Sequence, residues 1–217
     1  MRFADGAPFL ETLIAGTPEN ICSGASAPCY LQVDGSTVAS SFSYGTITSF
    51  LNLTAGTHSL VARDDLGYAV GPMKTAALAA GKHYTLIVVG TYPNYSVLTF
   101  EEPASSGDAQ LSLYEASPAM PQAEFGSFSA MGHSGFKQLG SAKLGSVAAV
   151  DLGKSVSNFG GYVGKPSATI GTATPEQLNA FDRHNVLPFH VAARLSLFLF
   201  DAKPSTAVGP VFGSLDK

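Results

Sequence analysis

Short segments of alternating apolar and polar residues run through the first half of the chain, separated by turn-forming residues. CYLQVDGSTVASSF, residues 29–42, alternates on both sides of an Asp-Gly pair, and THSLVARDDLGYAV, residues 57–70, does so around Asp-Asp-Leu-Gly. A period of two is typical of half-buried strands, and Asp-Gly is typical of tight hairpins. The pattern predicts about seven short strands before Glu102, the number expected for one β-sandwich.

The second half of the chain repeats features of the first. ADGAP, residues 4–8, is echoed by YEASP, residues 114–118, in which an acid, two small residues and a proline follow an apolar strand. YGTITSFLNLTAG has a degraded counterpart in LGSVAAVDLG, and LIVVGTYPNYSVLTF has one in LSLFLFDAKPSTAVGPVFGSL. Similarities that recur in the same order about half a chain length later indicate an internal duplication.

The expected fold is therefore all-β, with two tandem immunoglobulin-like β-sandwich domains. The first occupies residues 1–102, a linker of small and polar residues occupies 103–108, and a second, divergent repeat occupies 109–217. The second repeat carries an insertion at about 160–188, which contains TPEQLNAFDRH. Its threonine, proline and glutamine fit an N-cap, a first-turn proline and a capping box, so a short helix is predicted from Pro175 to His184.

Composition agrees with the β class and excludes some partners. Hydrophobic residues make up 45%, charged residues 13%, and there are 23 Gly and 13 Pro, which suits short strands joined by turns. The net charge of −4 and the absence of a Lys/Arg cluster exclude nucleic acid as the expected partner. The apolar runs YTLIVVG and RLSLFLF are shorter than the roughly 18 residues of a membrane-spanning helix, so no span is expected.

The two cysteines bear on the compartment. Cys22 and Cys29 stand in ENICSGASAPCYL, close enough to lie on one loop, and a disulfide between them would imply an oxidising environment. Two unrelated thiols are the alternative, and a zinc pair is disfavoured because structural zinc takes four ligands. Met1 is followed at once by RFADGAP, which reads as domain sequence, so the leader of an exported protein is absent from this chain.

The phrase Leu-x-Ala-Gly-x-His occurs twice, ending at His58 and at His83. The Ala-Gly pair suits a turn, and the residues after it begin a strand, so both histidines are predicted to stand at strand entries. A metal site would need a third suitable ligand, which the spacing does not provide. We therefore favour the structural interpretation.

Candidate catalytic residues gather in the second repeat. GHSGF resembles the nucleophile elbow Gly-x-Ser-x-Gly around Ser134, but Phe136 replaces the second glycine and the flanks lack the strand and helix that the elbow needs. Asp182, His184 and His190, in DRHNVLPFH, and Asp201 farther on could complete a triad. The two histidines could bind a transition metal. A Gly/Ser loop and a helix end followed by a proline exit are the favoured alternatives. No cofactor is expected.

Remaining features are less specific. Tyrosines crowd the first repeat, where they could bind glycans but are more often sheet packing. The scattered aspartates form no calcium loop. Asn52 and Asn94 stand in Asn-x-Ser/Thr sequons, which matter only where exported proteins are glycosylated.

One family resemblance can be stated from these segments. RFADGAP, YEASPAMP, YGTITSFLNLTAGTHSLVARD and LAAGKHYTLIVVGT are similar to the secreted tandem repeats catalogued as domain of unknown function 4397. In that family a strand ends in a His-Ala-Ser-Pro-like phrase, and an Ala-Gly-Thr turn introduces a strand. The resemblance implies an exported bacterial or archaeal surface protein with paired β-sandwiches, and it brings no known activity.

Two functions from different classes follow. The favoured one is an exported cell-surface or extracellular protein that acts without catalysis, by binding, adhesion or self-assembly with protein, with its own copies or with glycan. The alternative is a secreted hydrolase or metal-dependent enzyme with its site in the second repeat. The lack of a convergent acid and base set favours the first.

Overall fold

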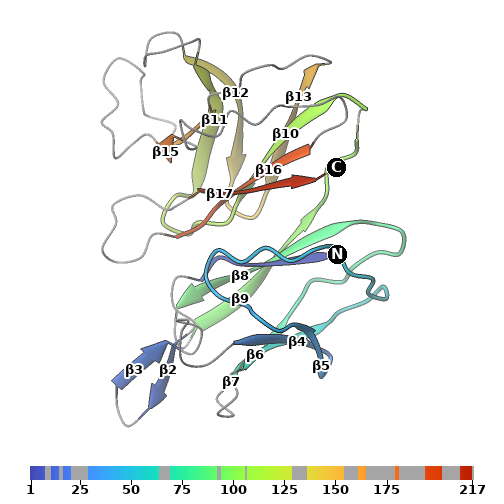
Figure 1. The fold of residues 1–217 in the computed structure, drawn as a ribbon, viewed down its shortest axis with the longest axis vertical. Coiled ribbons are helices and arrows are strands. Elements are labelled where there is room, and N and C mark those ends of the chain that lie inside the picture. The colour runs from blue at the N-terminus through green and yellow to red at the C-terminus, as the bar shows by residue number, and fades with distance from the viewer. Residues whose placement is uncertain are drawn as a thin grey trace. The chain divides into compact units, whose positions relative to one another are not determined.

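The computed structural model divides the chain into two compact units, Met1–Glu102 and Pro103–Lys217, which are described separately below (Figure 1). The residues that the structure describes are 1–7, 11–14, 17–20, 29–63, 69–91, 94–105, 107–128, 136–153, 161–164, 179–180, 194–201 and 211–216.

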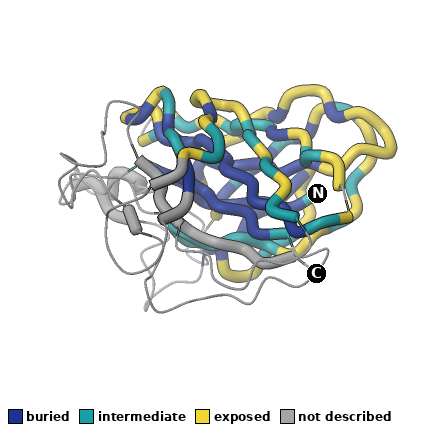
Figure 2. The backbone as a smooth tube through the Cα atoms, turned by 90° about the horizontal axis from the view of Figure 1, so that it is seen from above, coloured by how far each residue is buried: buried dark blue, intermediate teal, exposed yellow. Residues whose placement is uncertain are grey.

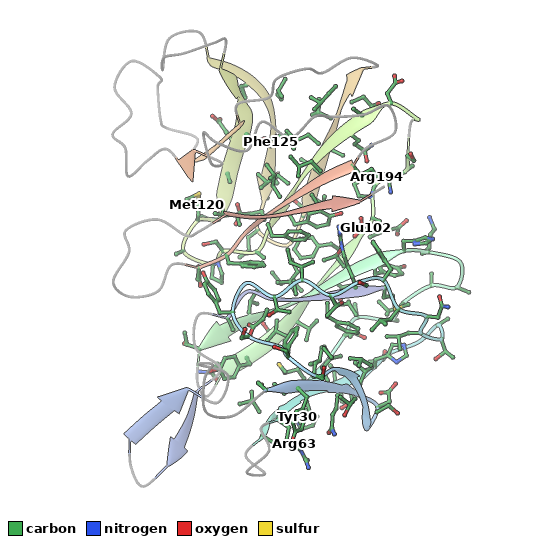
Figure 3. The ribbon with its side chains drawn as sticks, in the orientation of Figure 1. Tyr30, Arg63, Glu102, Met120, Phe125 and Arg194 are labelled. Carbon is green, nitrogen blue, oxygen red and sulfur yellow. The ribbon has the colours of Figure 1, made fainter. Side chains whose placement is uncertain are left out.

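Unit 1 contains two sheets and a separate hairpin. One sheet has the order β1-β8-β9 and the other β5-β4-β6-β7, while β2 pairs only with β3. In the second sheet Tyr30 stands opposite Arg63, and both are labelled in Figure 3. The strands are β1 (Arg2–Asp5), β2 (Glu11–Ile14), β3 (Thr17–Asn20), β4 (Tyr30–Val33), β5 (Ser36–Ala39), β6 (Ser59–Arg63), β7 (Ala69–Lys74), β8 (Tyr84–Thr91) and β9 (Asn94–Glu101).

Unit 2 is built from two four-stranded sheets. Their orders are β13-β10-β16-β17 and β12-β11-β14-β15. The strands are β10 (Ala109–Glu115), β11 (Gln122–Phe128), β12 (Phe136–Lys143), β13 (Val147–Gly153), β14 (Gly161–Gly164), β15 (Asn179–Ala180), β16 (Arg194–Leu199) and β17 (Val211–Asp216).

The two units share one topology. In each, the first strand runs parallel to the first strand of the last antiparallel pair, β1 beside β8 and β10 beside β16, while the other strand pairs are antiparallel. An isolated antiparallel bridge from Ala4 to Ile47 takes the place in unit 1 that β13 takes in unit 2. The expectation of tandem all-β sandwiches is therefore confirmed, and the described residues contain no helix.

The duplication extends to single hydrogen bonds. The Gly45 N–H donates to the carbonyl of Asp5 over 2.8 Å, and the Gly145 N–H donates to the carbonyl of Glu115 over 2.9 Å. These pairs join YGT to ADGAP in the first unit and LGS to YEASP in the second. Asp5 and Glu115, which end the first strands of the two units, therefore occupy equivalent positions.

The turns before these contacts are equivalent as well. The Thr46 N–H donates to the Ser43 carbonyl and the Ser146 N–H donates to the Lys143 carbonyl, both over 2.8 Å. In each turn the hydroxyl of the last residue also accepts a main-chain N–H, from Ser43 or from Lys143. Hydroxyl-bearing residues stabilise such turns by local bonds, which explains why Thr and Ser recur there.

The hairpin between β4 and β5 follows from its two-residue loop. Asp34 and Gly35 have φ values of 49° and 82°, as a type I′ turn requires. The Asp34 N–H donates to the carbonyl of Ser59 over 2.9 Å, which ties this turn to the start of β6. The hairpin predicted from the Asp-Gly pair is confirmed.

Each unit buries its own apolar core. Figure 2 shows the buried residues as continuous dark-blue stretches, with exposed residues gathered mainly in turns. Burial of large side chains supplies the main stabilising free energy of such sandwiches. The core of unit 1 includes Phe3, Leu31, Phe42, Leu60, Leu86 and Val88, and that of unit 2 includes Leu111, Leu113, Met120, Phe125, Leu197 and Leu199, of which Met120 and Phe125 are labelled in Figure 3.

The predicted insertion at 160–188 needs a correction. Gly161–Gly164 forms β14, which pairs with β11, and Asn179–Ala180 forms β15, which pairs with β14. These segments are strands of the sandwich, and the helix predicted from Pro175 to His184 is wrong at Asn179 and Ala180. Pairing with β14 overrides the local capping signal, because helix propensity is a weak prior against tertiary contacts. The rest of that helix lies outside the described residues.

The hairpin between β8 and β9 depends on a glycine. Gly90 has a φ of 106°, and a Cβ there would overlap the main-chain oxygen of Asn94. Gly81 also has a positive φ, 74°, but no atom lies within 4 Å of its Cβ position. A side chain at Gly81 would meet backbone strain alone, whereas one at Gly90 would meet both backbone strain and steric overlap.

We predict that Gly81→Ala costs about 1 kcal/mol of unfolding free energy, from left-handed strain alone. Gly90→Ala is expected to cost about 1–3 kcal/mol more, because the hairpin backbone must move. Urea unfolding followed by circular dichroism measures both. Equal losses in the two variants would contradict the close approach of β9 to Gly90.

Candidate functional site

Most of the predicted catalytic and metal residues, and also Cys22, lie outside the described part of the chain: Ser134, Asp182, His184 and His190. Asp201, the remaining triad candidate, is described. The structure therefore does not test whether these residues come together. Among the residues that it does describe, no group of three or more His, Cys, Asp or Glu side chains could hold a metal ion.

A buried carboxyl group in unit 1 is the first feature with unusual chemistry. Asp5 ends β1 and is 0% exposed. Its Oδ1 accepts the N–H of Ala7 over 3.0 Å, while its Oδ2 is buried and has no hydrogen-bond partner. Burial raises the pKa of Asp5 to about 7, although the Ala7 N–H acts in the opposite direction. Asp5 therefore retains a proton far above the usual range of an aspartate.

Glu115 repeats this arrangement in unit 2. It ends β10, is 0% exposed, and accepts the N–H of Ser117 at Oε1 over 2.8 Å. Its Oε2 is buried without a hydrogen-bond partner, as Oδ2 of Asp5 is. Burial raises the pKa of Glu115 to about 8, the Ser117 N–H opposes this rise, and the negative charge of Asp201 adds to it.

Asp201 and Ser117 complete the polar group around Glu115. The Ser117 hydroxyl donates to Oδ1 of Asp201 over 2.7 Å, and the Ala119 N–H donates to the same oxygen over 3.0 Å. Ser117 is only 1% exposed, so a substrate carbonyl could not reach its hydroxyl. A serine nucleophile needs both access and a base that takes its proton. The group is suited to hold a proton in the interior and unsuited to acyl transfer.

The sequence contains a signal for the burial of these two acids, although we interpreted it only as evidence of duplication. An acid that directly follows an apolar strand and precedes two small residues occurs in both ADGAP and YEASP. Small residues let the chain turn close to the carboxyl, so that the N–H two residues later can reach it. The repeat of an acid at a strand end would have indicated a buried carboxyl.

His58 forms a second site, on the opposite sheet of unit 1. It stands directly before β6, as predicted, and is 4% exposed. Its Nδ1 lies 2.6 Å from Oδ2 of Asp34, and its Nε2 lies 2.9 Å from the carbonyl oxygen of Thr54. The other oxygen of Asp34 accepts the N–H of Ser59 over 2.9 Å. The side chain of Asp34 is half exposed, in contrast to that of His58.

Both ring nitrogens of His58 thus face acceptors. A carboxylate and a carbonyl can only accept, so both nitrogens donate and the ring carries a positive charge. The bond to Asp34 is the main cause that raises the pKa of His58 above its usual 6.5; burial opposes this rise, and the Thr54 carbonyl supports it. The same pair, with the Ser59 N–H, lowers the pKa of Asp34.

His83 has different surroundings. It stands directly before β8, as predicted, but it is exposed. Its carbonyl accepts the N–H of Glu102 over 2.8 Å, and its ring meets that of Phe50 edge-on, with centroids 6.1 Å apart. The two histidines of the repeated phrase therefore share a place in the strand but not a chemical role.

We predict that Asp34→Asn destabilises the fold at mildly acidic pH. Asn-Gly suits the same turn, so the variant removes the charge and keeps the backbone. The stabilisation is complete below the usual pKa of His58 and is lost as pH rises through the raised value. We expect a loss of about 1–3 kcal/mol at about pH 5.5 and a smaller one at about pH 9.

Urea unfolding at the two pH values measures the effect of Asp34→Asn. His83→Gln serves as the control and should leave the stability unchanged at both. A loss in Asp34→Asn that is equal at the two pH values would contradict a charged His58.

Comparison with known proteins adds one finding. A family model described as domain of unknown function (DUF4397) matches residues 23–125. The match begins within unit 1 and continues through β10 into β11, so it includes YEASP and not ADGAP. No curated protein matches the chain. The resemblance to the DUF4397 family that the sequence indicated is therefore confirmed over residues 23–125.

Proposed function

We propose that the protein is exported and acts on the cell surface or outside the cell by binding, as an adhesive or self-assembling module, without catalysis. The observation that carries the proposal is the edge formed by β9. A sheet edge presents unpaired main-chain N–H and C=O groups, to which another strand can add.

The outer strands of the second sheet of unit 1, β5 and β7, are less suited to pair with a further strand than β9 is. β5 has four residues, with a shift of register in its pairing with β4. β7 contains Pro72, which lacks an N–H, and its register with β6 also shifts. β9 pairs with β8 over eight consecutive residues without a shift, and in the described part of the chain no strand pairs with its other side.

Charge gives the β9 edge little protection. Its one charged residue is Glu101, which forms an exposed ion pair with Lys82 at 2.7 Å. Soluble proteins commonly guard edges with unpaired lysines or inward-pointing charges. The Ala76 N–H, from outside the sheet, donates to the Thr99 hydroxyl side chain over 3.4 Å near the end of the strand. The edge is thus suited to pair with a further strand.

The contact role can be tested by charging the edge. Ser96 is exposed on β9, and we expect Ser96→Lys to weaken self-association or attachment to cells at least about tenfold, because a lysine on an edge opposes strand addition. Thr37→Lys, on the blunted β5, is the matched control and should change nothing. Sedimentation and cell-binding assays measure both.

A non-adhering monomeric parent that hydrolyses an ester or a glycan would overturn the contact role. That result would favour the alternative of a secreted hydrolase or metal-dependent enzyme, with Ser134, Asp182, His184 and His190 as the residues to test first.

A disulfide between Cys22 and Cys29 supports export in this proposal. Cys29 is 3% exposed and belongs to the core of unit 1, where a bond to Cys22 would fasten the preceding loop to the sandwich. Such bonds persist in oxidising compartments. The sequons at Asn52 and Asn94 are both exposed, so a glycan could be accommodated at either.

We predict that thiol labelling of the unreduced, denatured protein detects no free cysteine. After reduction both cysteines should react, and the unfolding free energy should fall by about 2–4 kcal/mol. Two reactive thiols before reduction would remove this support for export.

A further inference from the structure

The two buried carboxyls share an environment that favours their neutral form. Among the described residues, each receives one main-chain N–H, from Ala7 or from Ser117, and the second oxygen of each has no hydrogen-bond partner there. A buried carboxylate normally requires a cation or several N–H donors. One N–H does not replace the water that an ionised carboxylate would lose.

No cation faces Asp5 among the described residues. Arg2 lies three residues earlier on the same strand, so its side chain leaves the opposite face, where it donates to Thr85 and pairs with Glu102 at 3.3 Å. β8 and the turn at 43–46, which pack against the strand end, contribute Tyr84 and Tyr44 as their titratable groups. Neither can supply a positive charge.

Among the described residues, Glu115 likewise has no cation that compensates it. β16 begins with Arg194, which donates to the carbonyl of Pro103 over 2.7 Å. Asp201 follows two residues after the end of β16, and its negative charge favours the neutral form of Glu115. The turn at 143–146 brings Lys143, whose side chain is exposed. The same neutral form is therefore favoured in both units by independent surroundings.

We propose that each unit contains a pH-sensitive switch, in which the proton on Asp5 or Glu115 holds the end of the first strand in place and its loss loosens that end. This inference goes beyond the contact role and does not depend on it.

The strand ends show what the proton secures. Beyond the acid, the Gly6 N–H donates to the carbonyl of Val88 over 2.9 Å, and the Ala116 N–H donates to that of Leu199 over 3.0 Å. These bonds continue the parallel pairing of the first strand with β8 or β16. An ionised carboxyl recovers its hydration only when water reaches it, and these bonds must open to let water in.

The direction of the pH dependence follows from proton linkage. In the unfolded chain both acids titrate near the usual values of 3.8 and 4.5, while burial raises the pKa to about 7 for Asp5 and about 8 for Glu115. At a pH between the usual and the raised pKa of each acid, the folded state binds more protons than the unfolded state. The contribution of each acid to the free energy of unfolding is therefore complete at low pH and is lost as pH rises. Each group raises the unfolding constant about tenfold per pH unit in its window. The charged His58 changes stability in the same direction.

The test compares the parent with Asp5→Asn, Glu115→Gln and the double variant. Each substitution keeps the oxygen that accepts the N–H and removes the proton that titrates. Urea unfolding from about pH 5 to about pH 9 should show the parent losing stability steeply and the double variant losing much less. Above about pH 8 the double variant should be the more stable protein. Asp151→Asn, at an exposed acid of β13, is the control and should follow the parent.

Amide hydrogen exchange in the parent keeps the proposal testable if a variant does not fold. The exchange rate of an exposed amide rises about tenfold per pH unit. The exchange rates of the Ala7 and Ser117 amides should rise more steeply than this with pH, while that of Leu86, in the middle of β8, should not. Equal pH slopes at the three amides, or equal pH dependence of stability in the parent and a folded double variant, would overturn the switch.

Discussion

The parallel pairing of the first strand with the first strand of the last antiparallel pair is the constraint on which each sandwich depends. In unit 1 it brings β1 beside β8, and in unit 2 it brings β10 beside β16. An acid ends the first strand of each unit, with its own N–H and C=O bonded to the neighbouring segment. Burial of this acid follows from the need to keep the strand end within the sheet.

The buried end of the first strand can accommodate a carboxyl group in its neutral, protonated form. An ionised carboxylate without a cation or several donors costs several kcal/mol in a protein interior, and a proton removes most of that cost. Unit 1 also buries an ion pair, in which Arg2 and Glu102 are 1% and 7% exposed and Thr85 bonds to both side chains. The contrast is informative, because Glu102 has an arginine opposite it and Asp5 does not. The charge of buried Glu102 is stabilised by Arg2, whereas buried Asp5 is stabilised by its own proton.

The DUF4397 match covers parts of both units. The matched segment, residues 23–125, contains the β4–β5 hairpin, β8 and β9, and then the first strand of the next unit. The recurrence of a buried acid at the ends of β1 and β10 indicates that it belongs to the repeated architecture. The β9 edge, in contrast to the buried acids, lies on the outside of one sheet of unit 1. We propose it as a surface for contacts with other molecules.

Local patterns in the sequence were sufficient for the hairpins and for the duplication. Asp34-Gly35 determined a turn, and the apolar run from Tyr84 predicted β8, because both depend on near neighbours. The parallel pairs could not be predicted in this way, since they join residues far apart in the chain. Nor could the roles of β14 and β15, where pairing overrode a capping signal, or the charge on His58, which depends on Asp34 from another hairpin. The catalytic alternative around Ser134 stays a prediction.

The protonation of Asp5 and Glu115 in the folded protein can be observed directly. Side-chain carboxyl ¹³C shifts, followed by NMR through a pH titration of the ¹³C-labelled parent, report each group separately. The account predicts midpoints of about 7 for Asp5 and about 8 for Glu115, while both groups remain neutral at mildly acidic pH. Midpoints near the usual 3.8 and 4.5 in the folded protein would contradict it.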